Sequence, residues 1–107
     1  MYYIYLLRCK DNTIYTGITN NINNRMNNHF TNKGAKYTKS HDPLKVELLY
    51  KCKNKSLASS LEYKLKTLTK KQKEELILNH NLKKYLPEID LRHYKLLELN
   101  LIDERFR

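Results

Sequence analysis

The chain has 107 residues and a mass of 12.9 kDa, which suits one domain with one hydrophobic core and excludes two independent domains. Hydrophobic residues (40%) and charged residues (30%) exclude an intrinsically disordered composition. Lys and Arg number 21 against 11 Asp and Glu, and the net charge of +10 favours a polyanionic partner, most commonly nucleic acid. Residues 1–78 carry 15 basic and 6 acidic side chains (+9) and residues 79–107 carry 6 and 5 (+1). We therefore expect the anion-binding surface in the first three quarters of the chain.

The amino terminus and the cysteines bear on the cellular compartment. The apolar run at residues 2–7 has no basic segment before it and is too short for a signal sequence or a membrane span. We therefore predict a soluble, intracellular protein of the cytoplasm, or of the nucleus in a eukaryotic or viral setting, without a membrane partner. Cys9 and Cys52 are too few for a disulfide framework, and no Cys-x-x-Cys or His-x-x-x-His pair indicates zinc.

Residues 2–9 and 13–17 predict a β-hairpin. Both segments are rich in aromatic, β-branched and aliphatic side chains, and the turn signal Asp11-Asn12 separates them. Alternation along the first segment places odd-numbered residues on one face and even-numbered residues on the other, and both faces are largely apolar. The first strand is therefore predicted to be central in its sheet.

An amphipathic helix is predicted for residues 20–30, with Thr19 as its N-cap. Its apolar stripe consists of Ile22, Met26 and Phe30. This periodicity opposes the low helix propensity of the six asparagines in the segment. Arg25 and His29 lie one turn apart at the edge of the stripe, where partly buried polar groups are expected. Residues 32–43 contain Gly, Pro and small polar residues and predict an irregular loop.

Three further elements follow in the main part of the chain. Residues 46–52 predict a third strand. A helix is expected from Ser56, as its cap, to about Leu68, with leucines along its inward stripe. The sequence Thr69-x-x-Gln72 is a capping box that opens another helix.

The Leu-rich stretch 91–102 predicts a helical tail. The residues expected to face inward are Tyr94, Leu97 and Leu101. Further leucines leave its remaining surface apolar, which indicates packing onto the domain or onto a second copy. We therefore expect an α+β protein: a small three-stranded, mixed or antiparallel sheet flanked by helices in residues 1–78, and a helical C-terminal extension in residues 79–107.

Two tyrosine-containing tripeptides stand ten residues apart in the predicted hairpin. They are Tyr3-Ile4-Tyr5 and Tyr15-Thr16-Gly17, and they are followed by Arg25, by His29, by the stretch Gly34-Ala35-Lys36-Tyr37-Thr38 and by Glu62. In this order and spacing the chain resembles the GIY-YIG nuclease family, in particular its small stand-alone members, over residues 2–78. Gly17 and Gly34 match glycines of the motif. Tyr3 replaces the first Gly of the namesake motif and Thr16 its Ile, at positions that are structural in the family.

The resemblance implies a nuclease fold with a one-metal active site. It implies that Tyr5 is the general base and that Tyr15, Arg25 and His29 bind phosphate or water. It also implies that Glu62 holds one divalent cation, Mg²⁺ or Mn²⁺.

The same residue types suit phosphodiester hydrolysis on chemical grounds alone. Mg²⁺ keeps most of its waters and is typically held by one or two carboxylates, which Glu62 can supply in part. The planar fork of Arg25 matches a phosphate bidentately. The phenols of Tyr5 and Tyr15 can orient or deprotonate water if Arg25 and a metal lower their pKa. Taken singly, these residues are more simply core-edge tyrosines, a solvated arginine, a structural histidine and one helix acid among several. Their joint spacing carries the functional interpretation.

A nucleic-acid-binding surface is expected in the basic part of the chain, where lysines neutralise phosphates and an aromatic ring stacks on a base. Its residues are Arg8, Lys36, Tyr37 and Lys39. The alternative for the lysines is a solvated loop. Lys70, Lys71 and Lys73 are interpreted as a solvated helix face and are left out of the site.

We therefore predict a metal-dependent endonuclease that hydrolyses DNA phosphodiester bonds. Single-stranded or structured DNA is the expected substrate. Tight sequence recognition in a major groove requires a recognition domain, and residues 79–107, which follow the nuclease module, are nearly neutral and do not suggest one. One alternative is a nucleic-acid-binding module that keeps the fold without cleavage. Another, compatible with the first, is a homodimer formed through the Leu-rich tail.

Overall fold

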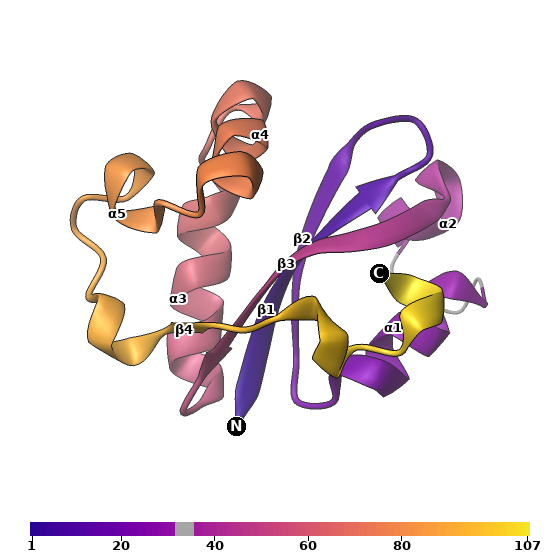
Figure 1. The fold of residues 1–107 in the computed structure, drawn as a ribbon, viewed down its shortest axis with the longest axis horizontal. Helices are drawn as coiled ribbons and strands as arrows, with labels where there is room; N and C mark the ends of the chain where they lie inside the picture. Colours follow the sequence, from indigo (N-terminus) through magenta and orange to yellow (C-terminus); the bar gives the residue numbers. More distant parts are fainter. Residues whose placement is uncertain (32–35) are drawn as a thin grey trace.

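The computed structural model describes residues 1–31 and 36–107 (Figure 1). Its centre is a four-stranded antiparallel sheet with the order β2-β1-β3-β4. The strands are β1 (Tyr2–Cys9), β2 (Ile14–Thr19), β3 (Pro43–Cys52) and β4 (Lys95–Leu96). The helices are α1 (Ile22–Phe30), α2 (Lys36–His41), α3 (Lys55–Lys66), α4 (Lys70–Asn79) and α5 (Leu82–Tyr85), and short 3₁₀ turns follow at Leu91–His93, Leu99–Leu101 and Glu104–Phe106. The α+β class is confirmed, with four strands in place of the three expected.

The predicted hairpin and the central place of β1 are confirmed. The Asp11 carboxylate accepts hydrogen bonds from the backbone N–H of Thr13 (3.2 Å) and from its hydroxyl (2.6 Å), and Asn12 adopts a left-handed conformation (φ 70°). Such side-chain bonds in a turn are typical of Asp and Asn. The register pairs Tyr5 with Gly17, so both lie on the same face of the sheet.

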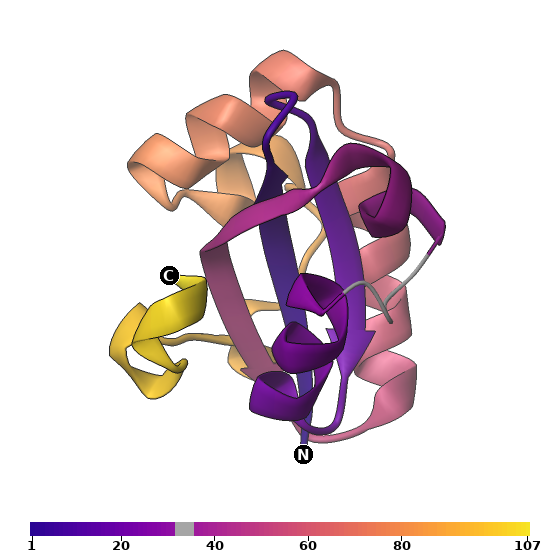
Figure 2. The same cartoon turned by 90° about the vertical axis from the view of Figure 1, so that its right-hand side faces the viewer.

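Helices cover both faces of this sheet, and each face has its own core (Figures 1 and 2). Even-numbered β1 residues such as Ile4 and Leu6 pack with α3, α4 and α5 on one side, which we call the α3 face. Odd-numbered residues such as Tyr5 and Leu7 pack with α1 and the end of the chain on the other side, the α1 face. The alternation predicted for β1 therefore positions Tyr5 on the face that α1 covers.

Two helices begin at residues other than the expected caps. The side chain of Asn21, not Thr19, accepts from the backbone N–H of N3 and caps α1, and Asn54, not Ser56, caps α3 in the same way. Asparagine is as good an N-cap as serine or threonine, so propensity alone did not separate the candidates. The capping box of α4 is confirmed, because both the side chain of Thr69 and that of Gln72 make their reciprocal bonds.

The expectation of an irregular loop over residues 32–43 is wrong for its second half. Residues 36–41 form the short helix α2, and Thr38 is its buried residue. The imidazole of His41 also contacts the Asp11 carboxylate and ties the helix to the β1–β2 turn. Tertiary contacts therefore stabilise a helix that polar composition did not indicate.

The expectation of a helical tail is also wrong. Residues 91–107 hold three 3₁₀ turns and the strand β4, which adds the fourth strand beside β3. Leu101, expected to face inward, is 58% exposed, whereas Ile102 and Phe106 are buried on the α1 face. The Phe106 ring lies 4.8 Å from that of Phe30. The leucines of the tail therefore follow neither a helical nor a strand period, because the tail crosses from one face of the sheet to the other.

The longest helix of residues 1–31 and 36–107 is α3, with 12 residues, and the other helices are shorter. None of them is long and apolar enough to cross a bilayer.

Candidate active site

The candidate site is built on the α1 face where β1 and β2 pair. Tyr5 lies opposite Gly17, and a Cβ atom at Gly17 would approach Tyr5 Cζ to 2.6 Å and Tyr15 Cε2 to 2.9 Å. A side chain at this position would therefore displace both rings. Gly17 supplies the space in which the two tyrosines lie with ring centroids 6.2 Å apart.

His29 of α1 connects these tyrosines to α2. Its Nε2 lies 2.7 Å from the Tyr5 hydroxyl, and its Nδ1 lies 2.8 Å from the hydroxyl of Thr38. The three side chains are buried. The rings of Tyr15 and His29 also meet edge to face, with centroids 5.5 Å apart. The histidine is thus held from both ring nitrogens, which fixes its orientation.

The protonation states in this chain follow from burial. Desolvation raises the pKa of Tyr5 far above its ordinary value, so the phenol is protonated at neutral pH. Burial and the nearby Arg25 lower the pKa of His29 to about 4, so the imidazole is neutral. Both hydroxyls can donate or accept, so the two bonds are compatible with either neutral tautomer of His29. In the tautomer whose Nδ1–H donates to Thr38, the Tyr5 O–H donates to Nε2, and the neutral imidazole can accept the Tyr5 proton.

Arg25 and Glu62 bring opposite charges to the same tyrosines. The carboxylate of Glu62 raises the pKa of Tyr5 and Tyr15, although burial is the larger cause at both, and the guanidinium of Arg25 opposes it. Both residues are only partly buried, in contrast to His29. The structure thus gathers all five predicted catalytic side chains, with Tyr5 and His29 beneath and Tyr15, Arg25 and Glu62 accessible to solvent.

A divalent cation would find one carboxylate here. The Glu62 side chain is 23% exposed, and its described partner is Lys66, at 3.4 Å on the next turn of α3. Exposed pairs of this kind are weak, so a cation can displace the lysine. No group of three or more His, Cys, Asp or Glu side chains that could enclose a metal occurs in residues 1–31 and 36–107. The donor set fits Mg²⁺ or Mn²⁺ that keeps its waters and shares a substrate phosphate, not an all-protein cage.

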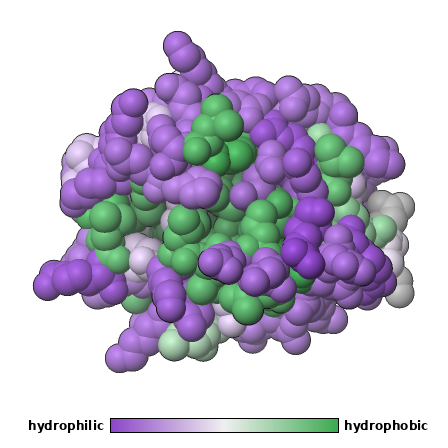
Figure 3. All heavy atoms as spheres, viewed as in Figure 1, coloured by the Kyte–Doolittle hydropathy of each residue, from purple (hydrophilic) through white to green (hydrophobic). Residues whose placement is uncertain are grey.

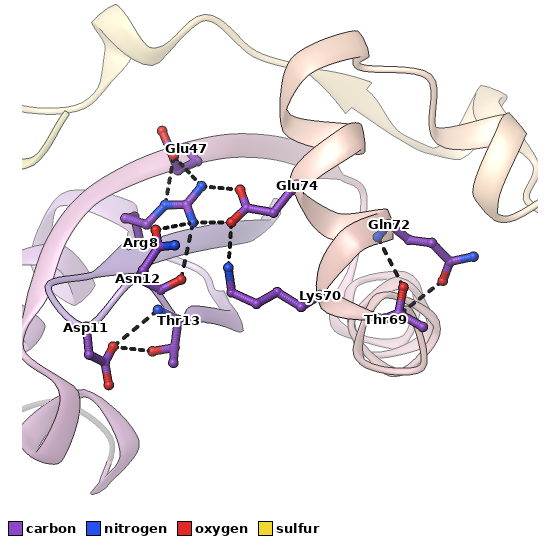
Figure 4. A network of polar contacts seen from close by, with 9 residues as sticks. All are labelled: Arg8, Asp11, Asn12, Thr13, Glu47, Thr69, Lys70, Gln72 and Glu74. Carbon is purple, nitrogen blue, oxygen red and sulfur yellow. Dashed lines mark hydrogen bonds and ion pairs between the residues drawn. The ribbon is translucent and has the colours of Figure 1, made fainter.

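The interpretation of Arg8 as a nucleic-acid-binding residue is wrong (Figure 4). Its side chain is only 10% exposed, and its guanidinium pairs with Glu47 at 2.9 Å and with Glu74 at 2.5 Å. These bonds, with a further one to the Asn12 side chain at 3.1 Å, occupy the planar fork. Arg8 is a structural residue that ties α4 to β1 and β3.

The other predicted nucleic-acid contacts lie on or beside α2. Lys36 and Lys39 are exposed, as a phosphate contact requires. Tyr37 stacks on His41 with ring centroids 4.0 Å apart and lies 5.5 Å from Tyr15. One face of its ring is therefore already covered, which leaves little room for base stacking. Gly34 lies outside the described residues.

Sequence reasoning left two residues near this site without a role. Thr38 belongs to the stretch that carried the family resemblance, yet only the fold shows that its hydroxyl meets His29. Its place in that stretch is the only signal in the sequence, because the burial of Thr38 becomes visible only in the fold. Lys73 was interpreted as solvated, yet it is partly buried near Tyr37.

The two departures from the namesake motif occupy structural positions. Tyr3 is partly buried and packs against the α1-face core. Thr16 is 3% exposed, and its hydroxyl has no hydrogen-bond partner within the part of the chain that the structure describes. The apolar surroundings of Thr16 thus suit the Ile of the namesake motif.

Comparisons with known proteins bear out the family. The family model described as the GIY-YIG catalytic domain matches residues 1–75, and the chain belongs to this nuclease family, whose substrates are nucleic acids. It is 47% identical over 76 residues to the UPF0213 protein FN1575 of Fusobacterium nucleatum, covering 71% of this chain and 76% of that protein. It is 43% identical over 93 residues to the UPF0213 protein CPE1444 of Clostridium perfringens, covering 85% and 100%. The solution NMR structure of the UPF0213 protein BH0048 from Bacillus halodurans is 33% identical, with 84% and 98% coverage and a TM-score of 0.48.

Proposed function

We propose that this protein is a metal-dependent endonuclease that hydrolyses phosphodiester bonds in DNA. The observation that carries the proposal is the convergence of five polar side chains from four elements, with a neutral imidazole bonded to a phenol. A purely structural cluster would gain nothing from the accessible arginine and carboxylate beside it. Perturbed groups gathered in this way are typical of active sites.

Glu62 is the proposed ligand of one Mg²⁺ or Mn²⁺ ion. When bound, such an ion neutralises developing charge on the phosphoryl oxygens and acidifies water. Arg25 is the proposed bidentate ligand of the scissile phosphate. Tyr15, whose phenol is partly exposed, orients that phosphate or the attacking water.

We propose that Tyr5 is the general base and that His29 receives its proton. The phenol passes its own proton to Nε2 as it takes one from water, so burial does not have to stabilise an isolated phenolate. Tyr5 is only 1% exposed, so substrate binding has to open a route from the attacking water to its oxygen. Hydrogen bonds at active sites often form fully only in the substrate complex. Tyr15 is the alternative base, because its phenol is the accessible one.

Single-stranded or structured DNA is the proposed substrate. Support comes from residues 79–107, which complete the core on both faces of the sheet and do not form a separate element that could enter a major groove. Base contacts would then come from the surface around the site itself.

Cleavage of labelled DNA tests the proposal directly. Single-stranded, duplex and branched oligonucleotides are incubated with the protein in Mg²⁺, in Mn²⁺ or in EDTA, with Glu62→Ala as the matched control. We expect metal-dependent cutting of single-stranded or branched DNA by the unsubstituted protein only. Binding of DNA without cutting in any metal would favour the alternative, a nucleic-acid-binding module that keeps the fold.

Self-association through the tail and a cytoplasmic location stay predictions. Apolar side chains gather on the surface over the tail (Figure 3), where Leu96 and Leu101 are 38% and 58% exposed. We propose a second copy of the chain as the partner of this surface. Light scattering after size exclusion measures the mass, and a monomer at all concentrations would contradict the proposal.

A further inference from the structure

A small cavity lies beside the candidate active site. Its volume is about 180 Å³, well below the roughly 300–1,000 Å³ of sites that hold whole small-molecule ligands. Its lining residues are Thr13, Ile14, Tyr37, Lys70 and Lys73. Two lysines, a threonine and a tyrosine around so small a space suit a single anionic group.

The two lysines of the cavity differ in how their charge is balanced. Lys70 donates to Glu74 at 2.7 Å, and the same carboxylate also holds Arg8 (Figure 4). Lys73 is partly buried and forms no ion pair with any carboxylate of residues 1–31 and 36–107. Burial, with a smaller contribution from the neighbouring Lys66, lowers the pKa of Lys73. A partly buried cation that faces another cation is stabilised by an added anion.

The cavity adjoins the active site along two paths. On one side, the ring of Tyr37 lies 5.5 Å from that of Tyr15. On the other side, Lys73 lies close enough to Lys66 for their positive charges to interact. Lys66 in turn pairs with Glu62 at 3.4 Å. A nucleic-acid strand whose phosphate lies at Tyr15 and Glu62 therefore passes next to this cavity.

The position of Lys73 is fixed by the helix that carries it. The Arg8–Glu74 ion pair holds α4 against the β1–β2 turn, and the capping box closes the start of the helix. A preorganised cation binds a phosphate with a smaller entropic cost than a mobile one.

We propose that this cavity binds a non-scissile phosphate of the nucleic-acid strand, adjacent to the phosphate that is cleaved, with Lys73 as its principal ligand. The proposal rests on the proposed function and extends it to the placement of the strand. It assigns a binding role to a helix face that sequence reasoning left as solvated.

Binding in EDTA tests the cavity without catalysis. The affinity of Lys73→Gln for a fluorescent single-stranded oligonucleotide is measured by anisotropy at several salt concentrations, and Lys71→Gln is the control because Lys71 is exposed on the same helix and does not line the cavity. We expect Lys73→Gln to weaken binding several-fold and to lower the slope of log K against log salt by about 0.7, the contribution of one single-strand phosphate contact. Lys71→Gln should change the slope far less. Equal effects of the two substitutions would overturn the proposal, because they would reflect net charge alone.

NMR titration locates the contact. A trinucleotide added in EDTA should shift the backbone amide signals of Thr13 and Ile14 in the unsubstituted protein and leave them unmoved in Lys73→Gln. Shifts that persist in the variant would overturn the assignment. In Mg²⁺, Lys73→Gln should raise KM and keep the single-turnover rate at saturation within about twofold. Loss of that rate with unchanged affinity would show that Lys73 acts in the chemistry instead. Binding without cleavage by the unsubstituted protein would overturn the nuclease proposal alone, since the EDTA measurements still decide this one.

Discussion

The two faces of the central sheet are both buried, but by different chemistry. On the α3 face, Leu61, Leu65 and Leu76 are completely buried in an apolar cluster with residues of β1 and β3. On the α1 face, Tyr5 and His29 are buried to the same degree but hold their polar atoms in hydrogen bonds.

One small sheet thereby combines stability on one face with chemistry on the other. On the α3 face, the apolar surface area removed from water stabilises the fold. Because side chains alternate along the strands, core positions on the α1 face can hold hydrogen-bonded polar groups. Substitutions on the α3 face should therefore lower the stability of the fold and leave the rate of the chemical step unchanged. Conservative substitutions on the α1 face should lower that rate and leave the stability unchanged. Glu62 is the instructive exception, because it comes from α3 and acts on the tyrosines of the other face.

Glu62→Ala is expected to have the largest effect. It should abolish cleavage in Mg²⁺ because it removes the one carboxylate proposed to hold the ion, and it should leave DNA affinity in EDTA within a few-fold. The thermal melt should hardly change, since the described partner of Glu62 is an exposed lysine one turn away. Cleavage at nearly the unsubstituted rate would contradict the one-metal assignment.

Leu61→Ala should do the opposite. Leu61 is fully buried on the α3 face, and truncation of such a leucine costs roughly 2–5 kcal/mol of unfolding free energy. Urea titration measures the loss, and the single-turnover rate below the melting transition should stay unchanged. A rate loss as large as the stability loss would show that the two faces are mechanically coupled.

Tyr5→Phe tests the α1 face with almost no change in volume. It should lower the single-turnover rate about 10²-fold or more, as expected for loss of a general base, and Tyr15→Phe should cost less and show partly as weaker binding. Both variants should melt near the unsubstituted protein, because an aromatic ring of similar size remains. If Tyr5→Phe keeps the full rate while His29→Ala loses it, the base is His29 and the role of Tyr5 is wrong.

The lowered pKa of His29 makes the stability of the fold depend on pH. The pKa of His29 is about 4 in the folded protein and about 6.5 in an unfolded chain, so only the unfolded state takes up this proton between these values. Stability should therefore be lost as the pH falls from about 6.5 to 4, by up to about 1.4 kcal/mol per pH unit.

Urea titrations at several pH values compare the unsubstituted protein with His29→Gln, which cannot titrate there. The Asp11 carboxylate, whose pKa its bonds to Thr13 and His41 lower to about 2, affects only the range below about pH 4. An identical slope in the two proteins above pH 4 would contradict the buried, neutral state of His29.

Much of this arrangement could be predicted from the sequence. Alternation along β1 predicted which residues share a face, and the four-residue spacing predicted that α1 buries the side that carries Ile22 and Met26. His29, expected to be partly buried at the edge of that stripe, is instead fully buried. The family motif indicated all five side chains of the candidate site. Local patterns suffice there because hairpin and helix periods are set within a few residues.

The rest depends on contacts between distant segments. Arg8 was interpreted as a phosphate ligand because its charge is visible in the sequence, but its partner Glu74 lies 66 residues further on. The tail follows no single period because it packs on two faces in turn. Helix α2 has a polar composition, and it is stabilised by Thr38 against His29 and by His41 against the β1–β2 turn.

Lys36→Ala is expected to have the smallest effect, and it tests the corrected view of α2. Lys36 is exposed at the first residue of that helix, next to Tyr37 and Thr38, which contact the site, so its ammonium can reach a strand bound there. Binding in EDTA should weaken about equally for all sequences, and the salt slope should fall by roughly 0.7 to 0.9, the value for one phosphate contact. Lys95→Ala is the matched control, because Lys95 lies in β4, at the sheet edge opposite β2. The amide signals of Thr13 and Ile14 should still shift on adding the trinucleotide, since Lys36 does not line the small cavity. An unchanged slope would show that the helix start points into solvent and that the strand follows Lys73 alone.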